Sequence, residues 1–272
     1  RILAINILGR FLSHRNNNLR YVALNTLNEV IHKNFKAVQR HRNTVIDCLK
    51  DGDISIRKRA LDLVYGLVNQ KNIRLLVPEL ISYLKFVRDK EFREDLLNKL
   101  SSAINKYSPD GQWRIDTMIC VLIEAGTYVN ENIPAQLIRF VLTDGDIQEY
   151  AVTKFYAAFL QQKTQPMLIE ISIWIIGEYG EMLLSTDSLS AAAIVDTLET
   201  FLQKTLPSDS RLRSVTLTSL IKLSHRLPSQ TERIQAIIAS YSKNFDVEVQ
   251  QRAVEFLNLF KFKDVLDQVM EP

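Results

Sequence analysis

The sequence is poor in the residues that interrupt helices or cross-link small domains. Its 272 residues include only 8 glycines, 7 prolines and 2 cysteines. So few turn-forming residues argue against a sheet protein, which needs a turn after every short strand. The cysteines, Cys48 and Cys120, lie far apart in the sequence and belong to no Cys-x-x-Cys pair. We therefore predict two reduced thiols in the core, and no disulfide framework.

Long hydrophobic runs and catalytic motifs are also missing. No stretch approaches the roughly 18 uninterrupted apolar residues that a transmembrane helix needs. The sequence contains no Gly-rich phosphate loop and no G-x-S-x-G motif, and its 4 histidines lack the H-E-x-x-H spacing of a zinc site. We predict that the chain is not an enzyme and binds neither a metal nor a cofactor.

One short phrase recurs along the chain. It consists of an apolar residue, a polar or basic residue, two variable positions, and two residues that are mostly small or aliphatic. Its six copies begin at Leu19, Ile56, Phe92, Ile147, Leu212 and Val249. Successive copies are 37, 36, 55, 65 and 37 residues apart. A period in the upper thirties is typical of stacked helix pairs of the HEAT or armadillo kind. We expect the two longer steps to contain insertions or an extra helix.

Apolar residues recur at helical spacing. Between residues 19 and 31 they form one stripe, which a single helix cannot bury and which predicts pairing with a second helix over residues 38–49. Further helices are expected at residues 54–68, 73–87, 91–107, 112–128, 133–142, 147–161, 166–184, 190–204, 211–226, 231–242 and 247–260. We predict an all-α fold: a single continuous α-solenoid of HEAT/armadillo-like helical repeats over residues 1–272.

Polar residues mark the expected helix starts. A carboxylate or amide at the N-cap accepts an unpaired backbone N–H, which stabilises a helix by about 1 kcal/mol. The expected caps are Asn17, Asp53, Asp146, Asp209 and Asp246. Gly177, within an apolar stretch that also holds Trp174, predicts close approach of a neighbouring helix, and Trp174 is expected to pack in the core.

The net charge of +3 conceals an asymmetry along the chain. Residues 1–60 carry 12 Lys and Arg against 4 Asp and Glu, whereas the remainder carries 22 against 27. The candidate partner-binding surface consists of two basic clusters, Arg40, His41 and Arg42, and Arg57, Lys58 and Arg59. We expect them at successive turns of the stack, where they either hold an acidic helix or a lipid headgroup or form a solvated face. Aromatic residues do not alternate with the basic ones, which argues against nucleic acid.

Three stretches resemble the large chains of clathrin adaptors. Residues 37–51 and 54–63 resemble γ-adaptins in particular, and residues 20–24 and 174–180 resemble adaptin large chains more generally. The similarity extends from residue 2 to about residue 184, and the acidic C-terminal repeats fit more loosely. The chain opens in what looks like the middle of a helix, so we expect it to be a fragment. It resembles the later part of an adaptin trunk, and the resemblance implies that the hinge and ear would follow residue 272.

The resemblance implies a scaffold segment of a heterotetrameric clathrin adaptor. The implied partners are a β-type large adaptin, a medium subunit and a small subunit, with an Arf-family GTPase and clathrin reached through other parts of the full-length protein. The implied location is the cytoplasmic face of the trans-Golgi network, endosomes and clathrin-coated vesicles, through peripheral membrane association of the complex. An alternative is a nuclear-transport receptor, whose solenoid wraps cargo and a small GTPase.

Overall fold

The computed structural model describes residues 2–126, 132–161, 165–185, 189–205 and 209–270. Every regular element in these ranges is an α-helix or a short 3₁₀ helix, which confirms the predicted all-α class. The chain divides into two compact units, residues 1–114 (unit 1) and residues 115–272 (unit 2). Each unit is a stack of helical repeats. The single continuous solenoid stays a prediction.

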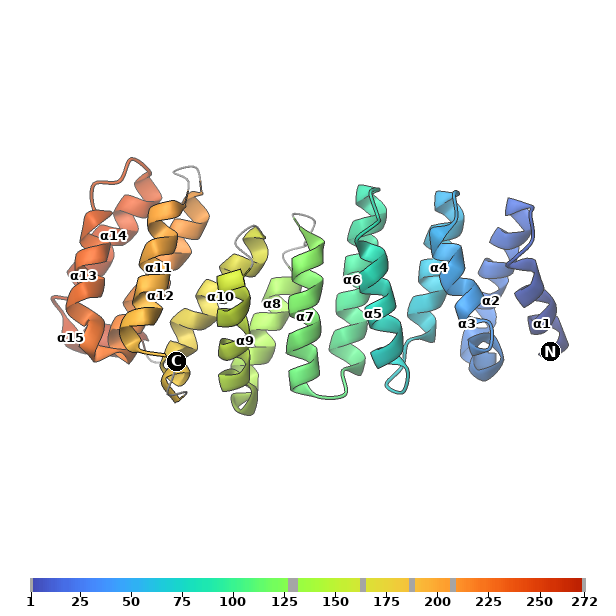
Figure 1. Ribbon diagram of the computed structural model, residues 1–272, viewed down its shortest axis with the longest axis horizontal. Coiled ribbons are helices and arrows are strands. Elements are labelled where there is room, and N and C mark those ends of the chain that lie inside the picture. Colours follow the sequence, from blue (N-terminus) through green and yellow to red (C-terminus); the bar gives the residue numbers. More distant parts are fainter. Residues whose placement is uncertain (1, 127–131, 162–164, 186–188, 206–208, 271–272) are drawn as a thin grey trace. The chain divides into compact units, whose positions relative to one another are not determined.

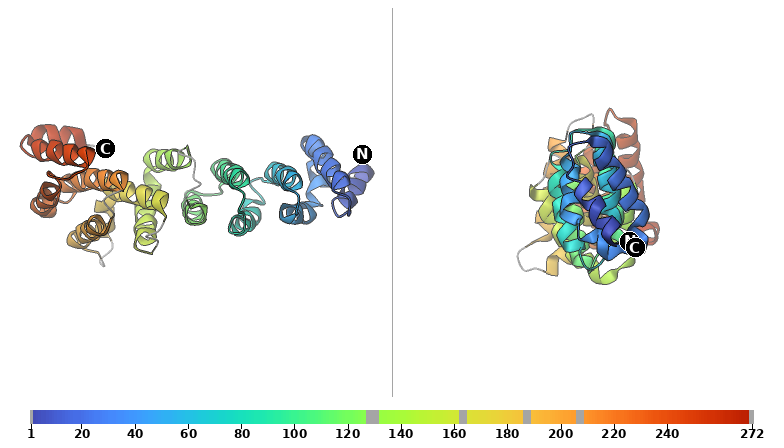
Figure 2. Two further views of the ribbon diagram at one scale, coloured as in Figure 1. Left: turned by 90° about the horizontal axis from the view of Figure 1, so that it is seen from above. Right: turned by 90° about the vertical axis from the view of Figure 1, so that its right-hand side faces the viewer.

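Unit 1 consists of α-helices that follow one another as antiparallel pairs (Figure 1). Its elements are α1 (Ile2–Phe11), α2 (Asn17–Gln39), α3 (Arg42–Asp47), the 3₁₀ helix η1 (Cys48–Lys50), α4 (Ile54–Leu67), α5 (Ile73–Leu84) and α6 (Lys90–Tyr107). Helix α2 packs against α4, and α4 packs against α6. Seen from above, the helices of this unit lie in two rows (Figure 2).

Unit 2 repeats this design with longer spacings. Helix α7 (Gly111–Ala125) contains the boundary between the units. The remaining elements are α8 (Asn132–Thr143), η2 (Gly145–Ile147), α9 (Gln148–Gln161), α10 (Pro166–Tyr179), η3 (Gly180–Ser185), α11 (Ala191–Lys204), α12 (Ser210–Arg226), η4 (Pro228–Gln230), α13 (Thr231–Ser240), α14 (Val247–Leu259) and α15 (Lys263–Met270). Helix α10 packs along both α9 and α12. None of the helices that the structure describes is long and apolar enough to cross a bilayer.

The recurring phrase lies at the start of the helices that form the core contacts. Its six copies lie in α2, α4, α6, α9, α12 and α14. The fifth residue of every copy is completely buried; these residues are Ala23, Ala60, Leu96, Ala151, Thr216 and Ala253. One helix separates phrase helices in the short steps, and two separate them in the long steps. The extra helix that the longer spacings predicted is therefore confirmed.

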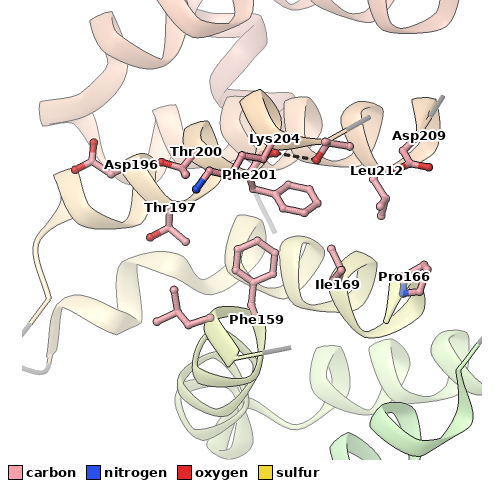
Figure 3. A pocket seen from close by; sticks show the side chains of 12 residues that line it. Phe159, Pro166, Ile169, Asp196, Thr197, Thr200, Phe201, Lys204, Asp209 and Leu212 are labelled. Carbon is pink, nitrogen blue, oxygen red and sulfur yellow. Dashed lines mark hydrogen bonds between the residues drawn. The ribbon is translucent and has the colours of Figure 1, made fainter. Parts of the chain in front are cut away.

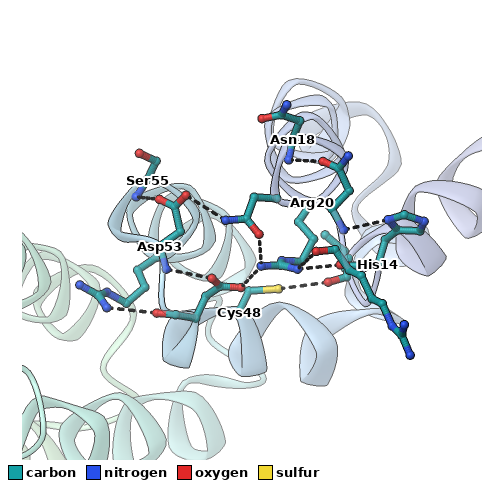
Figure 4. Close-up of polar contacts among 12 residues, drawn as sticks. His14, Asn18, Arg20, Cys48, Asp53 and Ser55 are labelled. Carbon is teal, nitrogen blue, oxygen red and sulfur yellow. Dashed lines mark hydrogen bonds and ion pairs between the residues drawn. The ribbon is translucent and has the colours of Figure 1, made fainter.

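In five of the six copies, the side chain of the polar residue of the phrase donates a hydrogen bond to the backbone that precedes its helix. Arg57 Nη1 donates to the carbonyl of Asp51 at 3.0 Å, and Arg213 Nη2 donates to that of Thr205 at 2.8 Å. Arg20 Nη1 donates to the carbonyl of His14 at 2.6 Å (Figure 4). The equivalent bonds of Arg93 and Gln148 reach the carbonyls of Val87 and Val141 at 2.8 and 3.2 Å. These contacts satisfy carbonyl groups at turns, where no helix can do so.

Several helix boundaries differ from the expected ones. Helix α2 runs on to Gln39 because Asn34, whose φ of −138° is non-helical, kinks it without ending it. The next helix therefore begins at Arg42 instead of residue 38, and Val38 is buried at the end of α2. The regular part of the predicted helix 166–184 ends at Tyr179, and the chain continues as 3₁₀ helix. Residues 127 and 128 of another predicted helix lie outside the described residues.

Two of the five expected caps form as predicted. The carboxylates of Asp53 and Asp246 accept backbone N–H groups of α4 and α14, and these bonds lower the pKa of both carboxyls. Asp209 stands at the N-cap of α12 but makes no capping bond. Asn16, not Asn17, caps α2. Asp146 lies inside η2, because a 3₁₀ turn precedes α9 and moves the helix start beyond it.

Helices α10 and α12 approach each other closely at a glycine. A Cβ atom added to Gly177 would lie 2.7 Å from the Cβ and Oγ atoms of Ser219. Ser219 Oγ in turn donates to the carbonyl of Ile173 at 2.9 Å. The predicted close approach at Gly177 is thus confirmed. Trp174 is half-buried, and Lys222 Nζ lies 5.8 Å from its ring centroid, so it borders the core instead of filling it.

Candidate partner-binding surfaces

The second predicted basic cluster makes contacts within unit 1. Arg57 donates to the Asp51 carbonyl, and its guanidinium carbon lies 5.8 Å from the ring centroid of Phe92. Arg59 Nε donates to the hydroxyl of Tyr21 at 3.2 Å, and its Nη1 lies 3.4 Å from a carboxylate oxygen of Asp62. Lys58 Nζ lies 3.4 Å from the carboxylate of Glu91. All three side chains therefore join α4 to its neighbours.

The first predicted basic cluster lies at the turn between α2 and α3. The helix predicted over residues 38–49 would contain all of it, but α2 is longer than predicted and Arg42 is the first residue of α3. The His41 ring packs against Gly9, where an added Cβ would lie 2.3 Å from ring atoms, and its Nε2 lies 3.4 Å from Asn6 Oδ1. Arg40 is exposed, and Arg42 Nε donates to Asn43 Oδ1 at 3.3 Å.

The structure does not bring the two clusters together. The helical segment of α3 and η1, residues 42–50, separates them. At about 1.5 Å of rise per residue, this segment is about 14 Å long. Arg40 and Arg42 lie at its start, whereas Arg57, Lys58 and Arg59 follow its far end. A binding surface formed by the six residues stays a prediction. Of the six, Arg40 and Arg42 are the two arginines that form no ion pair with a described residue and do not join α4 to its neighbours.

Sequence reasoning missed other exposed cations near this turn. Lys33, Lys36 and Lys50 are exposed and form no ion pair or hydrogen bond with any described residue. Lys36 and Arg40 are one helical turn apart, so they share a face at the end of α2. The i, i+4 spacing of these two residues was the signal that would have found this face. The consecutive basic residues at positions 40–42 conceal this face, because neighbours on one helix face are three or four residues apart.

A groove lies between α3–η1 and α5, and we call it the α3–α5 groove. Its volume is about 690 Å³. Apolar and aromatic side chains line it together with charged ones; they include Ile46, Leu49, Pro78, Tyr83, Arg42 and Lys50. The Tyr83 hydroxyl donates to the carbonyl of Leu49 and so joins the two walls. Phe86, just beyond the end of α5, also lines the groove, and 79% of its surface is exposed.

Unit 2 contains a second groove of about 560 Å³, which we call the α11 groove (Figure 3). The rings of Phe159 and Phe201 meet edge to face in it, with their centroids 5.3 Å apart. Ile169 and Leu212 extend the apolar lining, and Leu160 at the edge is 46% exposed. Its charged lining residues are Asp196, Lys204 and Asp209, and Arg233 already pairs with Asp196.

Buried charges join α10 to α12 in unit 2. Arg226 Nη2 lies 3.0 Å from the Glu178 carboxylate, and the two side chains are 6% and 10% exposed. Lys222 bonds the other Glu178 oxygen, and Glu181 lies 3.4 Å from Arg226 Nη1. Each buried charge therefore has an opposite charge beside it, as a low-dielectric site requires. These contacts hold the helices together and leave no group directed into either groove.

The two thiols differ in their exposure to solvent. Cys48 is buried, its Sγ lies 3.8 Å from the carbonyl oxygen of Leu12, and burial raises the pKa of the thiol to about 11. Cys120 is exposed, so the prediction of a core thiol is wrong there, because its position on α7 lies outside the buried stripe. Within the described ranges, no three side chains of His, Cys, Asp or Glu form a group that could hold a metal ion.

Comparison with known proteins gives this arrangement a family. The model of the family "Adaptin N terminal region" matches residues 1–264. The chain is 42% identical to the AP-1 complex subunit gamma of Dictyostelium discoideum, over 96% of this chain and 30% of that protein. It is 43% identical to AP-1 complex subunit gamma-1 of Mycosarcoma maydis, over 100% of this chain and 32% of that protein. It is 38% identical to the human AP-1 complex subunit gamma-like 2, over 97% of this chain and 34% of that protein.

The fold is also similar to that of a chain in a structure of the AP-3 complex. A chain of the "Homology model of the full-length AP-3 complex in an intermediate open conformation" superimposes with a TM-score of 0.66 over 99% of this chain and 55% of that one. The sequence identity is 18%, so this likeness concerns the fold alone. The chain spans about a third of the length of the curated relatives it matches. Since the family model matches almost all of it, the chain belongs to the adaptin N-terminal region family, and the resemblance to γ-adaptins is confirmed.

Proposed function

We propose that this chain is a scaffold segment of the γ-type large subunit of a heterotetrameric clathrin adaptor. The observation that carries the proposal is the family match over residues 1–264, together with 38–43% identity to AP-1 gamma subunits from an amoeba, a fungus and a human. In this role the chain supports subunit assembly and the sorting of proteins into coated vesicles. It acts at the cytoplasmic face of the trans-Golgi network and endosomes, and it performs no catalysis.

The physical basis of the proposed role is a stack of helices that hides its core and offers two grooves to partners. Stable subunit interfaces bury a total of roughly 1,200–2,000 Å² or more, and exposed helix rows can supply such areas. We propose that these rows contact a β-type large adaptin, a medium subunit and a small subunit. An Arf-family GTPase and clathrin are reached through other parts of the full-length protein. One continuous solenoid over residues 1–272 is part of this proposal.

Native mass spectrometry of the complex captured with the full-length protein tests the proposed function. The expected result is a four-chain assembly that contains a β-type large chain, a medium chain and a small chain. The helical-repeat fold also serves nuclear-transport receptors, so the same preparation is offered GTP-loaded Ran as a control. Capture of Ran without any adaptor subunit would contradict the proposal, as would a full-length protein that retains no subunit.

A further inference from the structure

We propose that the α3–α5 groove binds an acidic amphipathic segment of a protein partner. Phe86 is the apolar anchor of the contact, and Arg42 and Lys50 are its cationic rim. The inference rests on the proposed scaffold function and goes further, because it assigns one partner chemistry to one groove. It also gives the predicted basic residue Arg42 a defined role.

Phe86 is the first reason for this assignment. Its side chain is 79% exposed although it lines a groove, whereas the ring of Tyr83 one turn earlier is half-buried and joins α5 to η1. An exposed aromatic ring at the edge of an apolar hollow is costly to hydrate and is the type of residue that dominates binding energy in protein interfaces. Ile46 and Pro78 give a partner's apolar side chains a surface beside it.

The charges around the groove are the second reason. Arg42 and Lys50 line it, Arg40 lies two residues before Arg42, and Arg88 lies two residues after Phe86. No described residue forms an ion pair with any of these four cations. Unit 1 as a whole contains 21 Lys and Arg against 11 Asp and Glu, so the unit that carries the groove has a net positive charge. Complementary charge brings an acidic partner to such a site and orients it there.

The groove's own carboxylates select the class of partner. Asp47 and Glu79 also line it and are likewise without an ion pair. They disfavour a continuous polyanion, such as nucleic acid or an anionic bilayer, which would place negative charge against both of them. A peptide segment avoids this conflict, because it directs its acidic residues to one side and its apolar residues into the groove. Asn43 and Ser82 in the lining supply hydrogen-bonding groups for its backbone.

The experiment measures binding of a synthetic probe to the full chain by fluorescence anisotropy. The probe is a fluorescein-labelled amphipathic helical peptide with leucine and phenylalanine on one face and glutamate on the other. A matched peptide with glutamine in place of glutamate tests the charge requirement. Vesicles of phosphatidylserine and phosphatidylcholine test the alternative partner, and a basic amphipathic peptide tests selectivity.

Variants then locate the site. Phe86→Ala and Lys50→Glu change exposed side chains, so both proteins are expected to fold, and each should weaken binding by about tenfold or more. Leu75→Ala is the apolar control, because Leu75 is 61% exposed on α5 but does not line the groove. Lys71→Glu is the charge control, and Leu160→Ala tests the α11 groove. These three variants should bind the probe as the parent chain does.

Four outcomes would overturn the inference. They are no saturable binding of the acidic peptide, equal binding of the glutamine peptide, equal losses in the control variants, and binding to vesicles but not to the peptide. Subunit capture by full-length protein carrying Phe86→Ala is measured in parallel. If the four-chain assembly forms while the peptide does not bind, the inference about the groove fails and the proposed scaffold function stands.

Discussion

The two units differ in the sign of their net charge. Unit 1 has 21 basic and 11 acidic residues, and several of its cations are exposed without a partner; unit 2 has 13 basic and 20 acidic residues. In unit 2 the network of Glu178, Lys222 and Arg226 lies between helices, where charge serves internal contacts. The sign of a charged region and its availability to a partner are therefore separate properties. The sequence gives the sign, but only the contacts of each charged side chain show whether it is available.

The largest expected effect comes from comparing a buried ion pair of unit 2 with an exposed one of unit 1. Glu178→Gln leaves the guanidinium of Arg226, which is 6% exposed, without its main counter-charge. We expect a loss of about 3 kcal/mol in the free energy of unfolding. Glu91→Gln removes the partner of Lys58 from an exposed pair and should change it by less than about 1 kcal/mol. Urea unfolding of both variants checks this, and equal losses would contradict it.

A second comparison concerns a glycine in each unit. Gly177→Ala places a methyl group 2.7–2.8 Å from Ser219 atoms, including its Cα, so the backbones of α10 and α12 must separate. We expect Gly177→Ala to lower the free energy of unfolding by about 1–3 kcal/mol. Gly66→Ala in α4 meets the flexible Cδ1 of Ile31 at 3.1 Å, and the better helix propensity of alanine offsets the strain to within about 1 kcal/mol. Urea unfolding measures both variants. A larger loss of unfolding free energy for Gly66→Ala than for Gly177→Ala would contradict this prediction.

The helix caps provide a third and smaller contrast. Asp246→Ala removes a carboxylate that accepts two backbone N–H groups, whereas Asp209→Ala removes one that accepts none. Thermal unfolding should show a lower Tm for the first variant and little change for the second. Because the native pKa of Asp246 is lowered, its contribution is present above about pH 4, the unfolded pKa, and is lost as pH falls through the native value. A pH-independent difference between the variants would contradict this.

The thiols provide a fourth contrast, which concerns their reactivity. Cys120 should react with a thiol reagent in the native protein at pH 8, and Cys48 should react only on unfolding, because burial holds its pKa at about 11. Since that pKa is raised, the protonated thiol stabilises the fold below about pH 9, and this contribution is lost as pH rises towards about 11. Comparing the Cys48→Ala variant with the parent chain between pH 8 and 11 isolates the effect. Native reactivity of Cys48 equal to that of Cys120 would show that the site is open.

The fold was predictable because its signals are local and repeated. The spacing of the phrase located the core helices, and Asp53, Asp246 and Gly177 acted where their chemistry indicated. The binding surfaces were not predictable to the same degree. A run of consecutive basic residues does not reveal that Arg57 donates to a backbone carbonyl. Nor does it reveal that Arg59 donates to Tyr21, which lies 38 residues earlier in another helix. The groove at Phe86 depends on α3 and α5 lying side by side, which no local pattern records.

The carbonyl-bound arginines of the phrase imply a particular response to ionic strength. Arg57 donates to a neutral backbone oxygen at 3.0 Å and forms no ion pair with a described residue, so dissolved ions have little long-range attraction to screen there, whereas Arg20 also pairs with the Asp51 carboxylate at 2.9 Å. The exposed cations at residues 36, 40 and 50 attract a partner through solvent, where screening is strong beyond about 10 Å at 0.1 M salt. Concentrated salt should therefore release an acidic partner from a stack of helices that stays folded.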